Sequence, residues 1–533
     1  MRLSLLSVPL FGAALAAALA PSPGRTAPAP PPPLASTAWS PSVLSSSIEL
    51  AGSLARSTAA YTLRKDRNHA DQSDTWVVGV KGAGRNGGFV EATEGKGSAR
   101  RKLELVEVGG DDETTFYQLT LVPPHSSDMT YVTLSVDLPH ATRPEPPSMP
   151  QNADSIYMLF EGDLLAPLTG LSPTQRSKVT DMKVRIKTPT PRIVSAKAPD
   201  GFVMHQQAGS ATLVFTLQGD AGALGPQVAR VHYQQPEAIA SIRTLERIVE
   251  LSHWGANLAV QDSIDLFNAG PKLMGQFARI DYQKAIMHRR QGVTAVSSLA
   301  LALPPSTHNP YFYDVVGNVS TSRFRPSSSS AASTSHNAVL PSHSKKRREP
   351  AVLELQPRYP LLGGWNYSFT VGYDLPLAEY VKMRSGAKKG QYVAAVPFLT
   401  PVKDVAVDDV RVEVRLPEGA RDIAVHAPFP LTSLSYPSSA VDAPASDDTV
   451  TWTYLDSTGR PTVVMTKRAC TDRHGQEVLI EYTLPPLADA FQKPLACATV
   501  LFALFAAVIM AKRVSCGIKA PKEVVARRVG DEK

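Results

Sequence analysis

Cysteine is scarce in this chain, with three in 533 residues. Cys497 lies in an uncharged run near the C-terminus and Cys516 follows it, so the long part before that run contains only Cys470. A single cysteine cannot form an intrachain disulfide, which excludes the small disulfide-stapled scaffolds of secreted proteins. We expect stability to come from sizeable hydrophobic cores instead, and the length suggests two to three domains.

Motifs of catalytic sites are also missing. The sequence has no HExxH, no CxxC and no GxSxG, the patterns typical of zinc peptidases, redox or zinc sites, and serine hydrolases. One GxGxxG match, Gly82–Gly87, follows a strand-like stretch, but more glycine and Phe89 follow it instead of a helix that could hold a pyrophosphate. We interpret it as a glycine-rich hairpin loop, and we predict no catalytic residue, no cofactor and no metal ion.

Helical periodicity is sparse before the C-terminal run, whereas alternation of apolar and polar residues is common. Such runs predict antiparallel strands with one face on a core and the other in water. Residues 450–465 add a hairpin signal, with Gly459 where a left-handed backbone is needed. We predict a mainly β fold with two antiparallel β-sandwich-like domains. The clearest apolar sets are Val132/Leu134/Val136/Leu138, Leu213/Phe215/Leu217, Val410/Val412/Val414/Leu416 and Val478/Ile480/Tyr482/Leu484.

The uncharged run at residues 494–511 ends abruptly at Lys512 and Arg513. At about 1.5 Å per residue, the residues after Pro494 span roughly 26 Å, close to the hydrocarbon thickness of the endoplasmic reticulum membrane. The alternative is a buried core helix, but an uncharged run of this length favours the membrane. We predict one transmembrane helix that starts at Pro494, since proline suits a first helical turn.

The flanks of the chain predict its orientation. Residues 512–533 carry seven cations and three acids, so the positive-inside rule places this short basic tail in the cytosol. Residues 1–20, a charged start and an apolar stretch ending in small residues, read as a secretory signal peptide. The body therefore lies in a lumenal or extracellular space, and the formal net charge of +7 does not indicate a nucleic-acid partner.

Composition suggests the remaining boundaries. Residues 21–40 form a Pro/Ala-rich linker. We place the first β domain at 41–235 and the second at 236–493, because residues 221–235 mix glycine, proline and glutamine. Within the second domain, residues 325–349 are Ser-rich and end in a basic cluster. Such a cluster can be a nuclear signal, but in a lumenal segment we interpret 325–349 as a disordered insertion.

Two N-glycosylation sequons are present, Asn318-Val319-Ser320 and Asn366-Tyr367-Ser368. We predict a glycan on Asn318, which follows a glycine in a predicted loop and can reach solvent. Asn366 starts a predicted strand, where packing can block the transferase, so its occupancy stays open.

The apolar run carries small residues at a regular spacing. Thr499, Ala503 and Ala507 recur every four residues, so they share one face of a helix. Small residues at this spacing let a second transmembrane helix approach closely. We predict that this face packs against a partner helix, although alanine is common throughout this chain.

Several stretches in the second half carry a family resemblance by their order and spacing. They are Ser252-His253-Trp254-Gly255, Ile280-Asp281-Tyr282-Gln283, Gly317-Asn318-Val319-Ser320, Arg358-Tyr359-Pro360-Leu361-Leu362-Gly363-Gly364-Trp365, Val371-Gly372-Tyr373-Asp374-Leu375-Pro376 and Leu416-Pro417-Glu418-Gly419-Ala420. Together they resemble the ribophorin I family, the large single-span subunits of oligosaccharyltransferase. The long cytosolic helical domain of animal members is absent here, so contact with the translocon or ribosome through it stays open.

The resemblance implies a non-catalytic subunit of the complex that transfers the dolichol-linked oligosaccharide to Asn-x-Ser/Thr of nascent proteins. The implied partners are the other subunits, including the multi-spanning catalytic one, and the nascent polypeptide, in the endoplasmic reticulum membrane. Two other classes fit the same topology. A surface adhesion or receptor protein is disfavoured by the body's lack of disulfides, and a membrane-anchored hydrolase by the missing motifs.

Overall fold

The computed structural model describes most of the chain. Five predicted features lie wholly or mostly outside the described residues: the signal peptide, the 21–40 linker, the Gly82–Gly87 loop, the 325–349 insertion and the tail after Arg513. The described residues are 38–67, 73–81, 88–97, 100–110, 114–122, 128–287, 293–327, 349–384, 390–400, 402–437, 449–453, 456 and 459–513.

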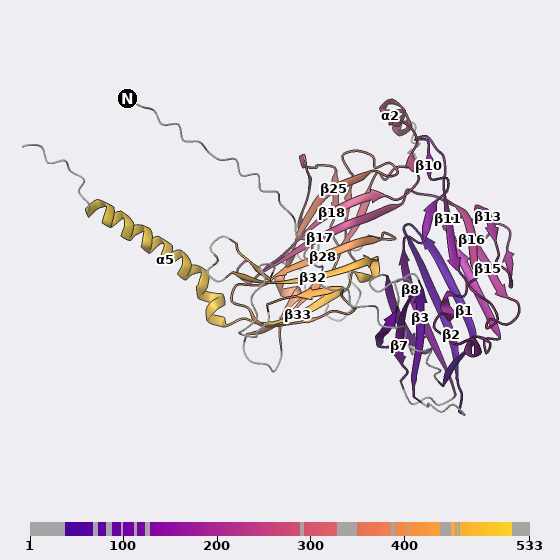
Figure 1. The fold of residues 1–533 in the computed structure, drawn as a ribbon. Helices are drawn as coiled ribbons and strands as arrows, with labels where there is room; N and C mark the ends of the chain where they lie inside the picture. Colours follow the sequence, from indigo (N-terminus) through magenta and orange to yellow (C-terminus); the bar gives the residue numbers. More distant parts are fainter. Residues whose placement is uncertain are drawn as a thin grey trace, which may run out of the picture.

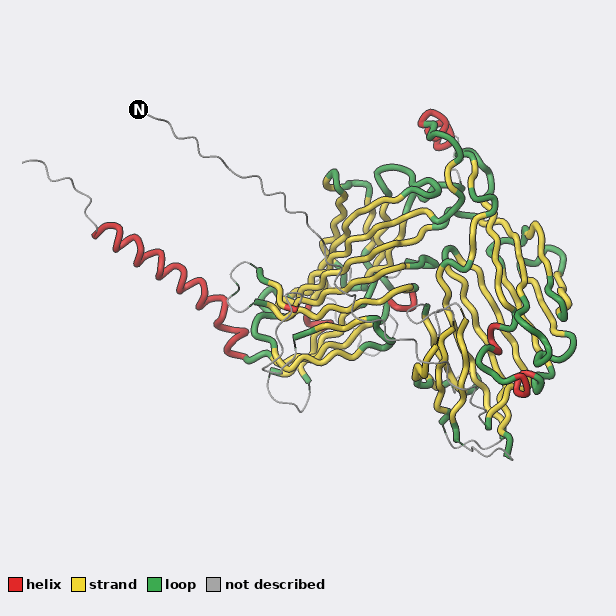
Figure 2. Tube along the Cα trace, viewed as in Figure 1, coloured by secondary structure: helices red, strands yellow, loops and turns green. Residues whose placement is uncertain are grey.

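Strands dominate and gather into two bodies, and helix α5 (Pro486–Arg513) projects from the second body away from the first (Figures 1 and 2). The first body contains an eight-stranded, a four-stranded and a three-stranded sheet. In sheet order the eight strands are β14 (Phe202–Gln206), β15 (Thr212–Leu217), β12 (Asp181–Lys187), β1 (Trp39–Ala51), β2 (Leu54–Lys65), β8 (Met129–Pro139), β4 (Phe89–Glu94) and β5 (Arg101–Lys102). The smaller sheets are β13 (Ile193–Lys197), β16 (Val228–Gln235), β11 (Ile156–Asp163), β9 (Thr142–Pro144), and β3 (Thr75–Lys81), β7 (Thr114–Thr120), β6 (Leu105–Gly110).

The second body is organised around a nine-stranded sheet, with a four-stranded and a three-stranded sheet beside it. Its large sheet runs β22 (Gly317–Asn318), β21 (His308–Asp314), β25 (Asn366–Pro376), β18 (Asn257–Asn268), β17 (Ala240–Ser252), β28 (Val407–Arg415), β32 (Arg460–Cys470) and β30 (Ser433–Ser435), with β31 (Val450–Thr451) also on β32. The others are β26 (Val381–Met383), β27 (Gln391–Pro397), β33 (Glu477–Thr483), β29 (Arg421–His426), and β20 (Leu299–Leu303), β24 (Ala351–Leu355), β23 (Ser322–Arg325). Short helices α1 (Pro173–Arg176), α2 (Arg279–Met287) and α4 (Leu377–Tyr380) connect strands.

Each body has its own hydrophobic core. One cluster of buried side chains runs from Trp39 to Ile239 and the other from Ile242 to Leu484. Strands alternate where the sequence predicts it: the apolar sets Val410/Val412/Val414 of β28 and Val478/Ile480/Tyr482 of β33 are all buried. The mainly β fold with antiparallel sheets is confirmed. Within the two large sheets, two pairs of adjacent strands depart from the antiparallel rule: β1 pairs with β12, and β17 with β28, in parallel.

Two local expectations have clear outcomes. The hairpin at residues 450–465 is confirmed: Val450 lies opposite Pro461, and Gly459 has a φ of +76°. A side chain at Gly459 would also lie 2.6 Å from Val450. The interpretation of Gly82–Gly87 as a hairpin loop is wrong, because β3 and β4 on either side belong to different sheets. The glycines connect two sheets.

The 325–349 insertion joins two neighbouring strands. β23 ends at Arg325, which lies opposite Val352 of β24 in the three-stranded sheet. Because the ends of this connection are held side by side, its length does not disturb the sheet.

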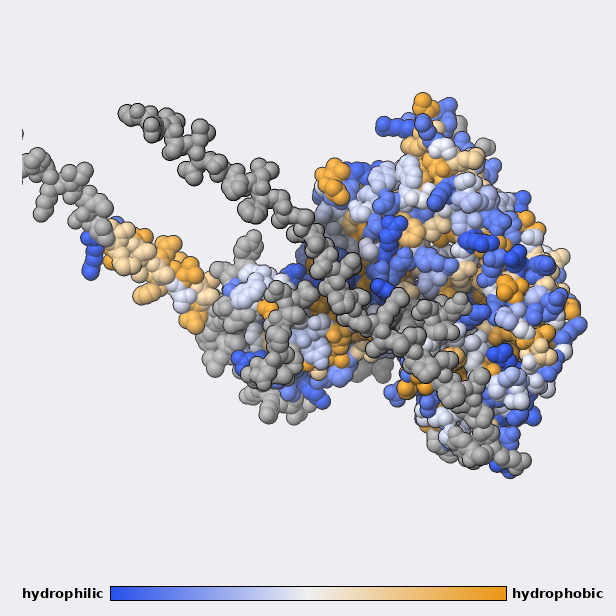
Figure 3. Space-filling model, in the orientation of Figure 1, coloured by the Kyte–Doolittle hydropathy of each residue, from blue (hydrophilic) through white to orange (hydrophobic). Residues whose placement is uncertain are grey.

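Helix α5 begins earlier than the sequence suggested. It starts at Pro486, so Pro494 lies inside the helix and not in its first turn. The expectation failed because the eight residues before Pro494 continue the helix, at the cost of the backbone hydrogen bond that proline cannot donate. The part from Pro494 to Arg513 is long and apolar enough to cross a membrane and has no buried residue, and its surface is almost uniformly apolar in Figure 3.

Candidate functional site

The two bodies meet along a polar contact that starts at the β1–β2 turn. Ser53 donates its N–H to the Asp404 carbonyl at 3.2 Å, and its Oγ accepts from the N–H of Ala406 at 2.7 Å. Gly52 directly precedes Ser53 in this turn. It has a φ of +55°, and a Cβ on it would lie 2.3 Å from the carbonyl oxygen of Asp404. Only glycine fits this close approach without displacing the facing loop.

Charged side chains continue the contact. One terminal nitrogen of Arg56, on β2, lies 2.8 Å from Asp404 and 2.7 Å from Asp472. Nearby, Arg473 pairs with Asp137 of β8 at 3.2 Å. Asp137 is completely buried, and this burial raises its carboxyl pKa. A buried carboxylate costs stability unless the cation that pairs with it stays in place, so Asp137 depends on Arg473. We call Gly52, Ser53, Arg56, Asp137, Asp404, Asp472 and Arg473 the seam.

Two more contacts cross between the bodies. His140, after β8, lies 2.6 Å from Asp408 through its Nε2 and stacks on Phe267 with ring centroids 6.3 Å apart. The short strands β10 (Ser148–Met149) and β19 (Lys272–Leu273) pair in parallel. With the seam, these contacts hold the bodies together over an extended line, so the surface that they form together has a defined shape.

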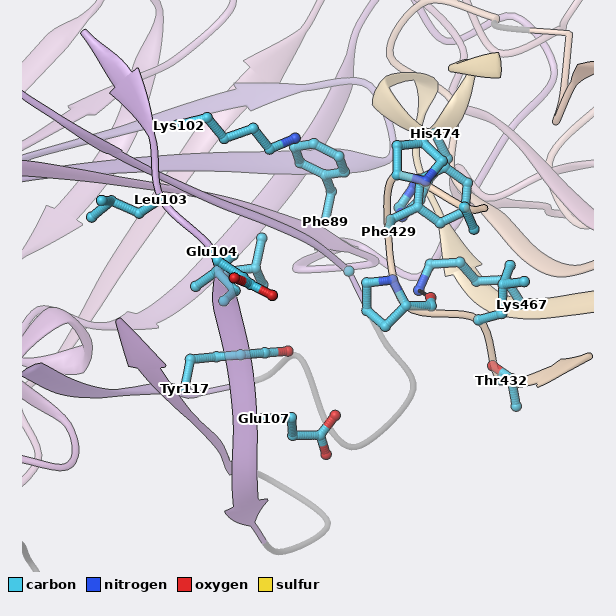
Figure 4. A pocket seen from close by; sticks show the side chains of 17 residues that line it. Phe89, Lys102, Leu103, Glu104, Glu107, Tyr117, Phe429, Thr432, Lys467 and His474 are labelled. Carbon is cyan, nitrogen blue, oxygen red and sulfur yellow. Dashed lines mark hydrogen bonds between the residues drawn. The ribbon is translucent and has the colours of Figure 1, made fainter. Parts of the chain in front are cut away.

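Beside the seam lies a cavity of about 950 Å³ with walls from both bodies, seen from close by in Figure 4. The first body contributes Tyr117, Glu104 and Glu107, and the second contributes Phe429, Thr432 and Lys467 on the opposite side. We call this cavity the groove. Its lining residues are Gly88, Phe89, Val90, Lys102, Leu103, Glu104, Leu105, Glu107, Tyr117, Ala427, Pro428, Phe429, Pro430, Leu431, Thr432, Lys467 and His474.

Burial shifts the pKa values of two groove residues, His474 and Tyr117, away from neutral pH. His474 packs edge-on to Phe89 and Phe429, and this burial lowers its pKa to about 3. Burial raises the pKa of Tyr117 to about 12 and that of Cys470, close by in the chain, to about 12. Groups with such values keep one protonation state, whereas a general acid or base needs a pKa near the working pH.

Lys467 differs from these groups because it is a buried lysine with a single hydrogen-bond acceptor. Its side chain is almost fully buried, and its ammonium donates to the Pro430 carbonyl at 2.9 Å and lies 5.8 Å from the centre of the Phe429 ring. Burial lowers its pKa. Among the described residues, no carboxylate lies within 4.0 Å of it. An ammonium has three N–H donors, so Lys467 has donors left for a bound group.

A second buried polar cluster lies inside the second body. Arg247 of β17 holds Asp262 of β18 with two nitrogen–oxygen distances of 2.7 Å, and donates to the Pro397 carbonyl at 2.8 Å. Thr400 donates to the same Asp262 at 2.7 Å. Sequence reasoning missed this cluster. Arg247 stands between Leu245 and Val249 on the inward face of its strand, and a charge at an inward position is the signal that could have found it.

The predicted glycosylation sites both lie on the second body. Asn318 is exposed on β22, followed by buried Val319. Asn366 is the first residue of β25 and is also exposed, while its carbonyl accepts from the Tyr359 hydroxyl at 2.8 Å. Exposure therefore does not separate the two sites, and their occupancy stays a prediction.

The predicted packing face lies on α5. Thr499, Ala503 and Ala507 are exposed, and the Thr499 hydroxyl is bonded within the helix to the Ala496 carbonyl at 2.8 Å. The hydroxyl therefore has its hydrogen bond without a partner helix. This face would favour a partner helix through the small size of its side chains. The glycosylation sites, the helix face and the groove lie in separate parts of the fold.

Taken together, these features define a class: a β protein of two coupled bodies on one helix suited to a membrane. A family model described as Ribophorin I matches residues 39–512, and the chain belongs to the ribophorin I family.

Two curated proteins illustrate its relatives. Subunit 1A of dolichyl-diphosphooligosaccharide–protein glycosyltransferase from Arabidopsis thaliana is 29% identical over 83% of this chain and 65% of its own length. Subunit 1 of the same enzyme from Caenorhabditis elegans is 26% identical over 90% of this chain and 73% of its own length. A solved M1 zinc metallopeptidase from Deinococcus radiodurans is similar over 41% of this chain and 49% of its own, with 12% identity and a TM-score of 0.22, a likeness too loose to carry an argument.

Proposed function

We propose that this chain is a non-catalytic subunit of the oligosaccharyltransferase complex, which transfers the dolichol-linked oligosaccharide to Asn-x-Ser/Thr of nascent proteins. The observation that carries the proposal is the family match over residues 39–512, which includes both bodies and the helix. Its relatives are named as subunit 1 of this glycosyltransferase. In this role the chain stabilises the assembly and handles the polypeptide substrate.

The architecture supports a scaffold. The seam couples the two bodies, and β33 ends only two residues before α5 begins, so the whole β assembly has a short attachment to its anchor. The pKa values of the groove residues His474 and Tyr117, both far from neutral pH, support a non-catalytic role for these two side chains. In this proposal the chemistry belongs to the multi-spanning catalytic subunit.

The proposed location is the endoplasmic reticulum membrane, with both bodies in the lumen and the basic tail in the cytosol. Cations after the span support this orientation. In this proposal, residence in the reticulum follows from membership of the complex.

Affinity purification of the full chain in mild detergent tests the proposal. We expect the catalytic subunit of the glycosyltransferase among the recovered partners in comparable amounts. In sealed microsomes, added protease should remove only the short tail. Recovery of the chain without the transferase subunits, or loss of the β bodies to the protease, would contradict the proposal.

The small-residue face of α5 makes the partner test sharper. In Ala503→Leu/Ala507→Leu, both substitutions raise hydrophobicity, so membrane insertion is kept. The bulkier side chains push the partner helix away, and overpacking of this kind costs about 1–3 kcal/mol. We expect weaker recovery of the catalytic subunit. Leu501→Ala/Leu504→Ala, which changes other faces of the helix, serves as the control, and equal recovery of the two variants would rule the face out.

A further inference from the structure

The groove is bordered by the free edges of sheets from both bodies. On the first body, residues 101–110 pass from β5, the edge of the eight-stranded sheet, to β6, the edge of the three-stranded sheet. On the second body, residues 427–432 lead into β30, which is the edge of the nine-stranded sheet. An edge strand has main-chain N–H and C=O groups without a neighbouring strand.

The β6 edge is unusually open. Its only strand partner among the described residues is β7. Val106 and Val108 are 51% and 41% exposed, while Leu105 and Glu107 alternate with them and line the groove. Natural edges are usually blocked by proline, lysine or a covering segment. β6 contains neither proline nor lysine. Its register with β7 shifts between Glu107 and Gly109, so the regular part before this bulge, Leu105–Glu107, is the part suited to accept an additional strand.

The walls of the groove fit side chains of a peptide better than the flat faces of sugars. Phe89, Phe429 and Tyr117 are each at most 9% exposed, so their ring faces are already covered and cannot stack on a sugar ring. The Lys467 ammonium, bonded so far to one carbonyl, offers N–H donors to a peptide carbonyl or a carboxylate. Figure 4 shows Tyr117 on one side of this space and Phe429 and Lys467 on the other.

We propose that the groove binds an extended segment of unfolded polypeptide, which adds a strand to β6 and places a carbonyl or carboxylate oxygen on Lys467. Main-chain pairing gives such a site affinity for many sequences, and alternate side chains enter the groove. This inference rests on the proposed function, because the transferase complex receives polypeptide before it folds. It assigns the substrate-handling role to the first body's open edge and the facing wall.

Site-specific photo-crosslinking from within β6 tests the inference directly. A photoreactive phenylalanine analogue replaces Val106 in the full chain, assembled in microsomes that translate a radiolabelled, stalled secretory protein. The matched control carries the analogue at Val194, a 54% exposed valine on β13, itself the edge of the four-stranded sheet. We expect an adduct at position 106 whose mass increases with the length of the stalled chain, and little at 194.

The results that overturn the inference are equally specific. An adduct of constant mass at position 106 would mean that another subunit covers the edge. An adduct that changes with glycosidase treatment alone would mean that the groove holds glycan. No adduct at 106, or equal adducts at 106 and 194, would also reject it. In each case the tagged chain is tested for co-purified transferase: its presence leaves the proposed function standing, and its absence overturns both.

A second variant probes the wall opposite β6. Lys467→Met keeps the length of the buried side chain and removes its donors, so we expect the adduct at position 106 to fall several-fold. Lys183→Met, at an exposed position on β12, should leave it unchanged. Equal co-purification of both variants with the transferase shows that they are folded, and an unchanged adduct in Lys467→Met would remove Lys467 from the site.

Discussion

The two bodies are built from the same kind of sheet, but they differ in what they bury. Among the described residues of the first body, Asp137 is the only buried side chain with a formal charge, and it faces the second body at the seam. The second body buries a complete ion pair, Arg247 and Asp262, between its central strands. Among the described residues, the first interior therefore contains no complete buried ion pair, whereas the second contains one whose two charges compensate each other.

This difference changes how each body responds to substitution. Apolar cores tolerate changes of shape if volume is kept. Removing one partner of a buried ion pair is strongly destabilising, because the remaining charge is left buried without an opposite charge. The second body should thus be the one whose fold depends on single polar residues, and the seam should depend on both.

The largest effect is expected from breaking the ion pair. Arg247→Met leaves Asp262 buried and uncompensated, which costs about 3–5 kcal/mol of unfolding free energy. Arg247→Met/Asp262→Leu should recover most of that loss. Denaturant unfolding of the purified full chain in detergent measures both variants. If the single and double variants lose the same stability, the charges are not what specifies the second body.

The next effect concerns the seam. Gly52→Ala places a Cβ against the Asp404 carbonyl and strains a positive φ, so we expect a loss of about 1–3 kcal/mol. The control is Gly209→Ala, which has a φ of +76° and no atom within 4 Å of its Cβ. It carries the backbone strain without the contact. Limited proteolysis between the bodies should accelerate only in Gly52→Ala, and equal rates would show that the turn does not couple them.

A smaller, pH-dependent effect is expected from His474. Its pKa is lowered from 6.5 to about 3 by burial in the folded chain, so the unfolded chain takes up the proton first. His474 therefore contributes its full stability above pH 6.5 and loses it as the pH falls toward 3. His474→Asn, which keeps an acceptor for the Thr471 N–H, should weaken the fall in melting temperature between pH 7 and 5. The control is His205→Asn, at an exposed position of β14, and it should behave like the unchanged protein.

The smallest effect is on the surface of the second body. Asn318→Gln should remove one glycan and increase gel mobility, and treatment with endoglycosidase should abolish the difference from the unchanged protein. Asn366→Gln serves as the comparison. If only Asn366→Gln changes the mobility, the predicted ranking of the two sequons is reversed.

Local patterns predicted more of this protein than distant contacts did. Alternation identified β8, β28 and β33 with their buried faces, because a strand's period of two appears directly in the sequence. The start of α5 was placed too late, since proline reads as a first-turn residue although the preceding residues also form helix. The seam could not be predicted: Arg56 and Asp472 are 416 residues apart, and no periodicity relates them. The groove depends on that contact, so it was missed with it.

The short connection between β33 and α5 has a further consequence. Only two residues, Leu484 and Pro485, separate the strand from the helix. The helix then continues for eight residues before Pro494, which is about 12 Å at 1.5 Å per residue. In the proposed topology, this part of the helix would hold the β bodies at a fixed height above the membrane surface. Flexible residues inserted after Leu484 would remove this fixed height.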